Sequence, residues 1–85
     1  MPYRIEIAPA AERQIRKLEA TVRRRIIDKI GTLGRKPRPA GAEKLTDTGV
    51  YRVRVGDYRI IYDIEHKVTT VLVLKVGDRK QVYKR

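Results

Sequence analysis

Arginine is the residue type in this chain that is best suited to act on a substrate. Arg52, Arg54 and Arg59 occur within one short stretch, residues 49–62, and Arg79 and Tyr83 follow near the end of the sequence. Guanidinium groups bind phosphate through paired hydrogen bonds and stabilise the extra negative charge of a phosphoryl-transfer transition state. In RNA the attacking group is built in, because the 2′-hydroxyl lies beside the phosphate that it can displace. Such arginines could therefore support RNA cleavage by positioning and charge stabilisation alone.

The composition excludes several other chemistries. The chain has no serine and no cysteine, so neither can act as a nucleophile activated by histidine. With the single histidine, His66, and scattered carboxylates, no set of residues has the spacing of metal ligands. Gly31 and Gly34 do not form the pattern of a phosphate-binding loop. We therefore expect no metal and no cofactor, and we expect His66 to be an exposed turn residue.

Residues 49–62 alternate apolar and polar side chains on both sides of Gly56-Asp57. Period-two alternation around a two-residue loop that contains glycine predicts a β-hairpin. The expected facing pairs are Val55 with Tyr58, Arg54 with Arg59, Val53 with Ile60, Arg52 with Ile61, and Tyr51 with Tyr62.

The hairpin should have one apolar and one basic face, because successive side chains of a strand point to opposite sides. The basic face carries Arg52, Arg54 and Arg59. Like charges directly opposite each other destabilise a sheet, so a bound polyanion would relieve the repulsion between Arg54 and Arg59. The alternative is that these arginines form an ordinary solvated face.

Length and charge restrict the class of protein. Eighty-five residues suffice for one small domain, and 21 Lys+Arg against 10 Asp+Glu give a formal net charge of +11. This charge favours nucleic acid, or an acidic protein, as the partner. The lack of cysteine fits a reducing cytoplasm, and no signal-peptide core or apolar membrane span is visible. We expect a cytoplasmic protein without a membrane partner.

The remaining elements follow from periodicity. Residues 3–7 alternate and predict a strand with Tyr3, Ile5 and Ile7 facing inward. Residues 10–33 show helical periodicity after Pro9, which suits a first helical position. We divide this region into two helices near Ala20-Thr21, with Thr21 as the cap of the second; the alternative is one long bent helix. The helix pair is expected to cover the apolar face of the sheet.

Residues 34–42 are expected to be a loop, with Gly34 just beyond the helix end and Leu45 anchoring the far end in the core. Residues 68–76 are apolar on both faces and predict a central or doubly covered strand, followed by a basic tail over residues 79–85. The predicted fold class is α+β: a single domain over residues 1–85, with an antiparallel sheet of about four strands, mixed at the first strand, and two N-terminal helices on one face.

Several of these stretches together resemble a known family. Leu45, residues 49–62, residues 76–79 and residues 82–83 resemble the RelE/ParE superfamily of type II toxin-antitoxin toxins, closest to the RelE branch. The resemblance implies the RelE-like fold and a ribosome-dependent endoribonuclease that cuts messenger RNA in the ribosomal A site, by 2′-hydroxyl attack and without metal. It also implies that the partners are mRNA on the ribosome, 16S rRNA and a RelB-like antitoxin that neutralises the toxin.

The resemblance also suggests roles for individual residues. Arg52 and Arg54 match the basic pair of the family, Arg59 its phosphate-binding arginine, Arg79 the arginine after the last long strand, and Tyr83 the tyrosine that stacks on the mRNA base. Further RNA-binding candidates are Lys44, Lys80, Lys84 and Arg85.

The residues at these positions do not identify the general base of the implied cleavage reaction. Relatives often carry lysine where this chain has Arg52 and Arg54, and arginine stays protonated. Tyr83 could act as the base if surrounding positive charge lowers its pKa, or the ribosomal RNA could assist. Two other functions remain possible: a ParE-like inhibitor of DNA gyrase without RNase activity, and a non-catalytic RNA-binding module.

Overall fold

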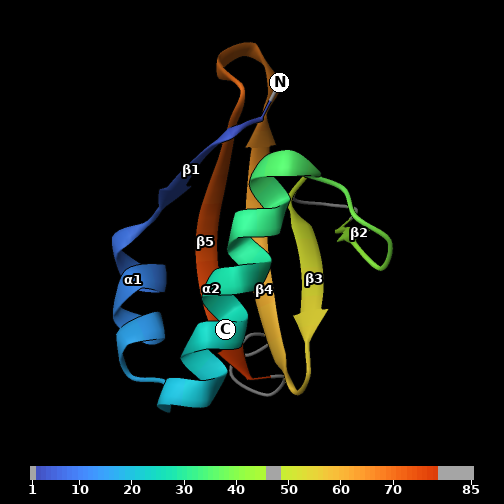
Figure 1. Cartoon of the computed structure of the whole chain (residues 1–85). Helices are drawn as coiled ribbons and strands as arrows, with labels where there is room; N and C mark the ends of the chain where they lie inside the picture. Colours follow the sequence, from blue (N-terminus) through green and yellow to red (C-terminus); the bar gives the residue numbers. More distant parts are fainter. Residues whose placement is uncertain (1, 46–48, 79–85) are drawn as a thin grey trace.

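A five-stranded mixed sheet with two helices on one face makes up the fold (Figure 1). The computed structural model describes residues 2–45 and 49–78. The strand order is β1-β5-β4-β3-β2; β1 pairs with β5 in parallel and the other pairs are antiparallel. The elements are β1 (Arg4–Ile7), α1 (Pro9–Arg16), α2 (Ala20–Arg35), β2 (Glu43–Lys44), β3 (Tyr51–Val55), β4 (Tyr58–Glu65), the 3₁₀ helix η1 (His66–Val68) and β5 (Thr70–Asp78).

The predicted α+β class and the mixed pairing at the first strand are therefore confirmed, with five strands in place of about four. The additional strand is β2, which lies just after the expected loop and has two residues. A strand this short has no alternation long enough to detect in a sequence.

The predicted hairpin is confirmed with its register. β3 and β4 pair Tyr51 with Tyr62, Val53 with Ile60 and Arg54 with Arg59. Gly56 has a φ of 61°, a left-handed conformation that glycine adopts without strain and that a two-residue hairpin loop requires. The local alternation and turn chemistry therefore determine which side chains face the helices.

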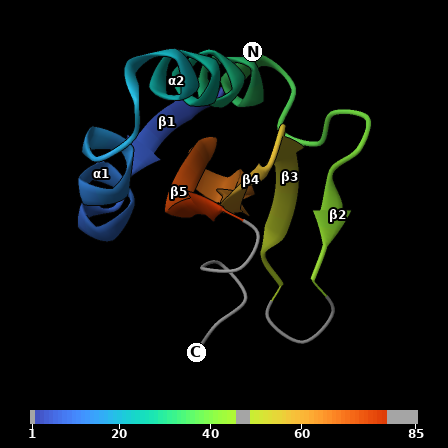
Figure 2. The same cartoon turned by 90° about the horizontal axis from the view of Figure 1, so that it is seen from below.

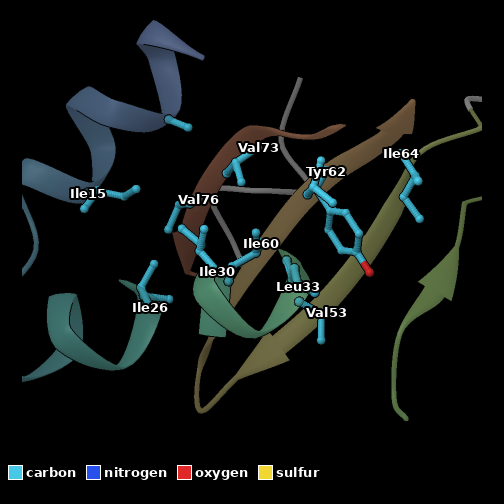
Figure 3. Packing of buried hydrophobic residues seen from close by; sticks show 12 residues of the cluster. Ile15, Ile26, Ile30, Leu33, Val53, Ile60, Tyr62, Ile64, Val73 and Val76 are labelled. Carbon is cyan, nitrogen blue, oxygen red and sulfur yellow. The ribbon is translucent and has the colours of Figure 1, made fainter. Parts of the chain in front are cut away.

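The core lies between this sheet and the helices (Figure 3). Ile15 of α1 and Ile26, Ile30 and Leu33 of α2 point toward the apolar face of β3, β4 and β5. The view from below shows both helices on the same side of the sheet (Figure 2). Because β5 lies between β1 and β4, the prediction of a central apolar strand is confirmed, although it begins two residues later than expected because η1 occupies residues 66–68.

The two-helix prediction is also confirmed, with a different cap. Pro9 opens α1, and Ala8 makes no side-chain capping hydrogen bond. The cap of α2 is Glu19 rather than Thr21, since the Glu19 backbone is extended and its carboxylate accepts a hydrogen bond from the Val22 backbone N–H at 3.4 Å. An acidic side chain at this position also complements the positive end of the helix dipole.

Three further expectations are wrong. Gly34 lies inside α2, where it packs against β1: the Tyr3 N–H donates to the Gly34 carbonyl at 2.6 Å. Ile7 is 40% exposed because it ends an edge strand. Leu45 is only partly buried and lies outside the core cluster, and its contribution comes from the backbone: its N–H donates to the Val50 carbonyl at 2.7 Å.

His66 is exposed, as predicted, and its Nδ1 lies 2.9 Å from the Tyr3 hydroxyl oxygen. In the part of the chain that the structure describes, no helix is long and apolar enough to cross a membrane.

Candidate nucleic-acid interface

The face of the sheet opposite the helices carries the arginines of the hairpin. Val53 and Ile60 point into the core, so the alternating Arg52, Arg54 and Arg59 must point to the other face. Figure 2 shows that neither helix covers this face. The structure therefore brings these three predicted site residues together on adjacent strands.

The three arginines differ in exposure. Arg54 is exposed, whereas Arg59, directly opposite it, is only 6% exposed. The alternative of an ordinary solvated face therefore does not hold at Arg59, because β4 is an inner strand with β3 and β5 on its two sides. A buried guanidinium is held in a more defined position than a surface one, which suits a group that binds an anion in one fixed geometry.

Arg52 forms an ion pair with Glu43, a residue that the sequence did not single out. Arg52 Nη2 donates to Glu43 Oε1, and the side chains are 22% and 62% exposed respectively. The contact follows from the β2–β3 register, which places Glu43 directly opposite Arg52. No sequence pattern indicates this register, since β2 has only two residues and follows a long loop.

All three arginines act electrostatically on the carboxyl group of Glu43. The hydrogen bond from Arg52 and its charge lower the pKa of the Glu43 carboxyl, and the charges of Arg54 and Arg59 lower it further. A negative group at this position is therefore stabilised by the charges of all three arginines.

Lys44 is not brought together with the arginines. It lies directly opposite Tyr51, and residues paired across two strands share a face, so Lys44 lies on the other side of the sheet from Arg52. Lys44 is exposed and lies on β2, at the edge of the sheet. The predicted site residues Arg79, Lys80, Tyr83, Lys84 and Arg85 lie outside the described residues.

The face of the sheet that carries the arginines changes from basic to acidic along β4. Ile61, buried to 8% exposure, follows Arg59 on the same face, and Asp63 and Glu65 continue the row. A hydrogen bond with Asp63, together with the negative charge of that residue, raises the pKa of Glu65. The face is thus basic near the hairpin turn and acidic at the far end, which favours a polyanion near the turn.

β5 brings the described end of the chain to the basic end of this face. Its last residue, Asp78, pairs with Tyr58, and Gly77 pairs with Arg59. Among residues 2–45 and 49–78, no three His, Asp or Glu side chains come together as a metal site would require.

Comparisons with known proteins agree with this architecture. The sequence profile of the ParE toxin family, the toxin of the type II toxin-antitoxin system parDE, matches residues 5–83. The chain belongs to this toxin family. Toxin RelG of Mycobacterium tuberculosis is 31% identical to this toxin over 87 residues and the match covers 100% of both chains.

Solved structures of related toxins show the same fold. The RelBE2 toxin-antitoxin complex of M. tuberculosis has a chain that matches with a TM-score of 0.83 and 29% identity, over 93% of this toxin and 100% of that chain. The archaeal RelE-RelB complex of Pyrococcus horikoshii OT3 gives a TM-score of 0.82 and 32% identity, over 93% and 97% of the two chains. The RelE-like fold predicted for this toxin is therefore confirmed.

Proposed function

We propose that this toxin is a ribosome-dependent, metal-independent endoribonuclease that cuts messenger RNA in the ribosomal A site and so inhibits translation. The observation that carries the proposal is the convergence of Arg52, Arg54 and Arg59 on one face, where together they stabilise a negative group. A cytoplasmic location, where ribosomes are present, is part of the proposal.

The proposed reaction needs little covalent chemistry from the protein. The 2′-oxygen loses its proton and attacks the adjacent phosphorus, the bond to the 5′-oxygen breaks, and that oxygen takes up a proton. Arg54 and Arg59 would bind the non-bridging oxygens and stabilise their added charge. Arg79 and Tyr83 would complete the site, Tyr83 by stacking on the base. The proton acceptor is Tyr83 or a group of the ribosomal RNA, because a guanidinium stays protonated.

A RelB-like antitoxin is the proposed protein partner. The two solved relatives described above are complexes of a RelE-type toxin with its RelB antitoxin. The net charge of +11 on this toxin would attract an acidic partner. RNA on the ribosome and the antitoxin would then compete for an overlapping basic surface.

The test is translation of a defined messenger in a reconstituted ribosome system, with new RNA ends mapped by primer extension. We expect new ends only when ribosomes are present, and a decrease of about ten-fold or more in cleavage for Arg54→Ala and for Arg59→Ala. Because Arg54 is exposed and faces the like charge of Arg59, its substitution should not lower stability, whereas Arg59→Ala needs a thermal melt as a control. Full activity in both folded variants would exclude the proposed role of this face.

Inhibition of DNA gyrase is the second candidate, because the matching family is named for ParE. A supercoiling assay with purified gyrase separates the two functions. Loss of supercoiling without new RNA ends would favour the gyrase inhibitor. Salt-sensitive RNA binding with neither activity would indicate a non-catalytic RNA-binding module.

A further inference from the structure

The ion pair between Glu43 and Arg52 places a carboxylate on the surface that should receive a phosphate. Glu43 Oε1 accepts a hydrogen bond from Arg52 Nη2, and the charges of Arg54 and Arg59 also act on this carboxyl. A carboxylate and a phosphodiester are alike in presenting oxygen atoms with negative charge to a guanidinium. Glu43 therefore holds the type of contact that a bound phosphate would make.

Two other ion pairs among the described residues lack this arrangement. Arg4 with Glu6 (3.7 Å) and Arg16 with Glu12 (3.5 Å) lie at the surface, with all four side chains 55–73% exposed. Arg52 is only 22% exposed, so the carboxylate of Glu43 engages a guanidinium that solvent reaches poorly. An RNA phosphate must therefore compete with Glu43 to reach it.

β2 is built so that such a competitor can leave. It has two residues, pairs with one neighbour, β3, at the edge of the sheet, and both of its side chains are exposed. Few buried contacts hold it in place, and the long loop before it can absorb a small displacement. Moving Glu43 away from Arg52 does not require the core to change.

We propose that Glu43 is an internal competitor of RNA: in the free toxin it occupies Arg52, and a substrate phosphate must displace it. This inference rests on the proposed function insofar as RNA is the ligand. As a consequence, the toxin would bind RNA less tightly than its net charge would allow. Weak binding to RNA that is not on the ribosome would then be disfavoured. Substrate held on the ribosome, with many contacts at once, would overcome the competition.

The direct test measures binding of a fluorescent 2′-O-methyl RNA oligonucleotide, which cannot be cleaved by 2′-oxygen attack. We expect Glu43→Gln to bind about two- to five-fold tighter than the native toxin, the range for an exposed ion pair. The matched control is Glu6→Gln, which changes net charge equally and breaks the surface pair with Arg4, but lies on β1 at the opposite edge of the sheet. It should shift affinity by less than about 1.5-fold.

Three binding results would overturn the proposal. The first is equal affinity of Glu43→Gln and Glu6→Gln, and the second is no RNA binding by any variant. The third is an undiminished gain from Glu43→Gln when Arg52→Gln is already present, because the competition acts through Arg52. A thermal melt of each variant confirms that it is folded.

Cleavage kinetics separate this role from proton transfer. If Glu43 acts as a competitor of RNA, the Glu43→Gln substitution should lower KM and preserve kcat and its pH profile. A large loss of kcat together with loss of the acidic limb of the pH profile would overturn the proposal and make Glu43 the general base. Absence of cleavage by the native toxin would refute the proposed nuclease and leave the binding result to decide the role of Glu43.

Discussion

At the scale of single residues, Tyr62 links the core of this toxin to the loop that precedes β2. The ring is fully buried among core side chains and stacks on Tyr51, with ring centroids 5.7 Å apart. Its hydroxyl donates to the Pro37 carbonyl at 2.6 Å (Figure 3 shows the hydroxyl pointing away from the core). This bond ties the start of the loop that precedes β2 to an inner strand of the sheet.

Alkaline pH should destabilise the fold through Tyr62. Burial raises the pKa of Tyr62 to about 12 from its ordinary 10. Since the folded state favours the neutral phenol, this contribution to stability is complete below about pH 10 and is lost as the pH rises through about 12. Tyr62→Phe should lower the free energy of unfolding at neutral pH by about 1 kcal/mol, because the Pro37 carbonyl loses its donor, and should weaken the alkaline decline.

Urea unfolding at a series of pH values measures both effects. Tyr58→Phe removes a phenol from the same strand, but from a half-buried position, and serves as the control. An alkaline decline in Tyr62→Phe as steep as in the native protein would show that another group is responsible.

At the scale of elements, each helix makes a close contact with the backbone of one strand of the sheet. α2 meets β1 at Gly34, where an added Cβ would lie 3.1 Å from the Tyr3 carbonyl oxygen and 3.3 Å from Ile5 Cδ1. α1 is fixed to β5 by Gln14, whose Oε1 accepts from the Val76 N–H at 2.7 Å. β1 pairs with β5 only as far as Val73, so Gln14 supplies the partner that the strand no longer provides.

Two glycines of α2 form a matched pair for testing the contact with β1. Gly31 has no atom within 4 Å of an added Cβ, so Gly31→Ala should raise the free energy of unfolding by about 0.5–1 kcal/mol, the gain for alanine in a helix interior. Gly34→Ala should instead destabilise by about 1 kcal/mol or more, because the Tyr3 backbone is held by its own hydrogen bond to Gly34. Urea titration of both variants gives the comparison; equal stabilisation by the two substitutions would mean that β1 moves away at little cost.

At the scale of the whole molecule, charge opposes compactness and promotes binding. A formal charge of +11 on 85 residues makes self-repulsion appreciable, and the exposed arginines of the helices add to it. The acidic pair Asp63 and Glu65 lies at the end of the sheet face remote from the hairpin turn. The same charges that destabilise the free toxin would therefore stabilise its complexes.

Salt should accordingly have opposite effects on folding and on binding. We expect the urea midpoint of the isolated toxin to rise as sodium chloride is added up to about 0.1–0.2 M, where the screening length falls to about 8–10 Å. The affinity for single-stranded RNA should decrease over the same range. A urea midpoint that falls with salt would show that attractive ion pairs, such as Glu43 with Arg52, outweigh the repulsion.

Sequence patterns predicted the structure correctly wherever residues close together in the chain determine it. The register of β3 with β4 follows from Gly56 and from strict alternation, because a hairpin turn leaves one pairing that keeps Val53 and Ile60 on the same face. The two helices and the start of α1 at Pro9 likewise follow from apolar periodicity and from the fixed φ of proline. The sequence by itself thus determined the fold class and placed Arg52, Arg54 and Arg59 on a common face.

Contacts between distant segments were decided only by the tertiary structure. Gly34 appeared suited to end a helix, but the close approach of Tyr3 explains its presence inside α2. The burial of Arg59 depends on β5, and the pairing of Glu43 with Arg52 depends on a two-residue strand that follows a long loop. No periodicity encodes such pairings, since their free energy comes from packing across the sheet rather than from neighbours in the chain.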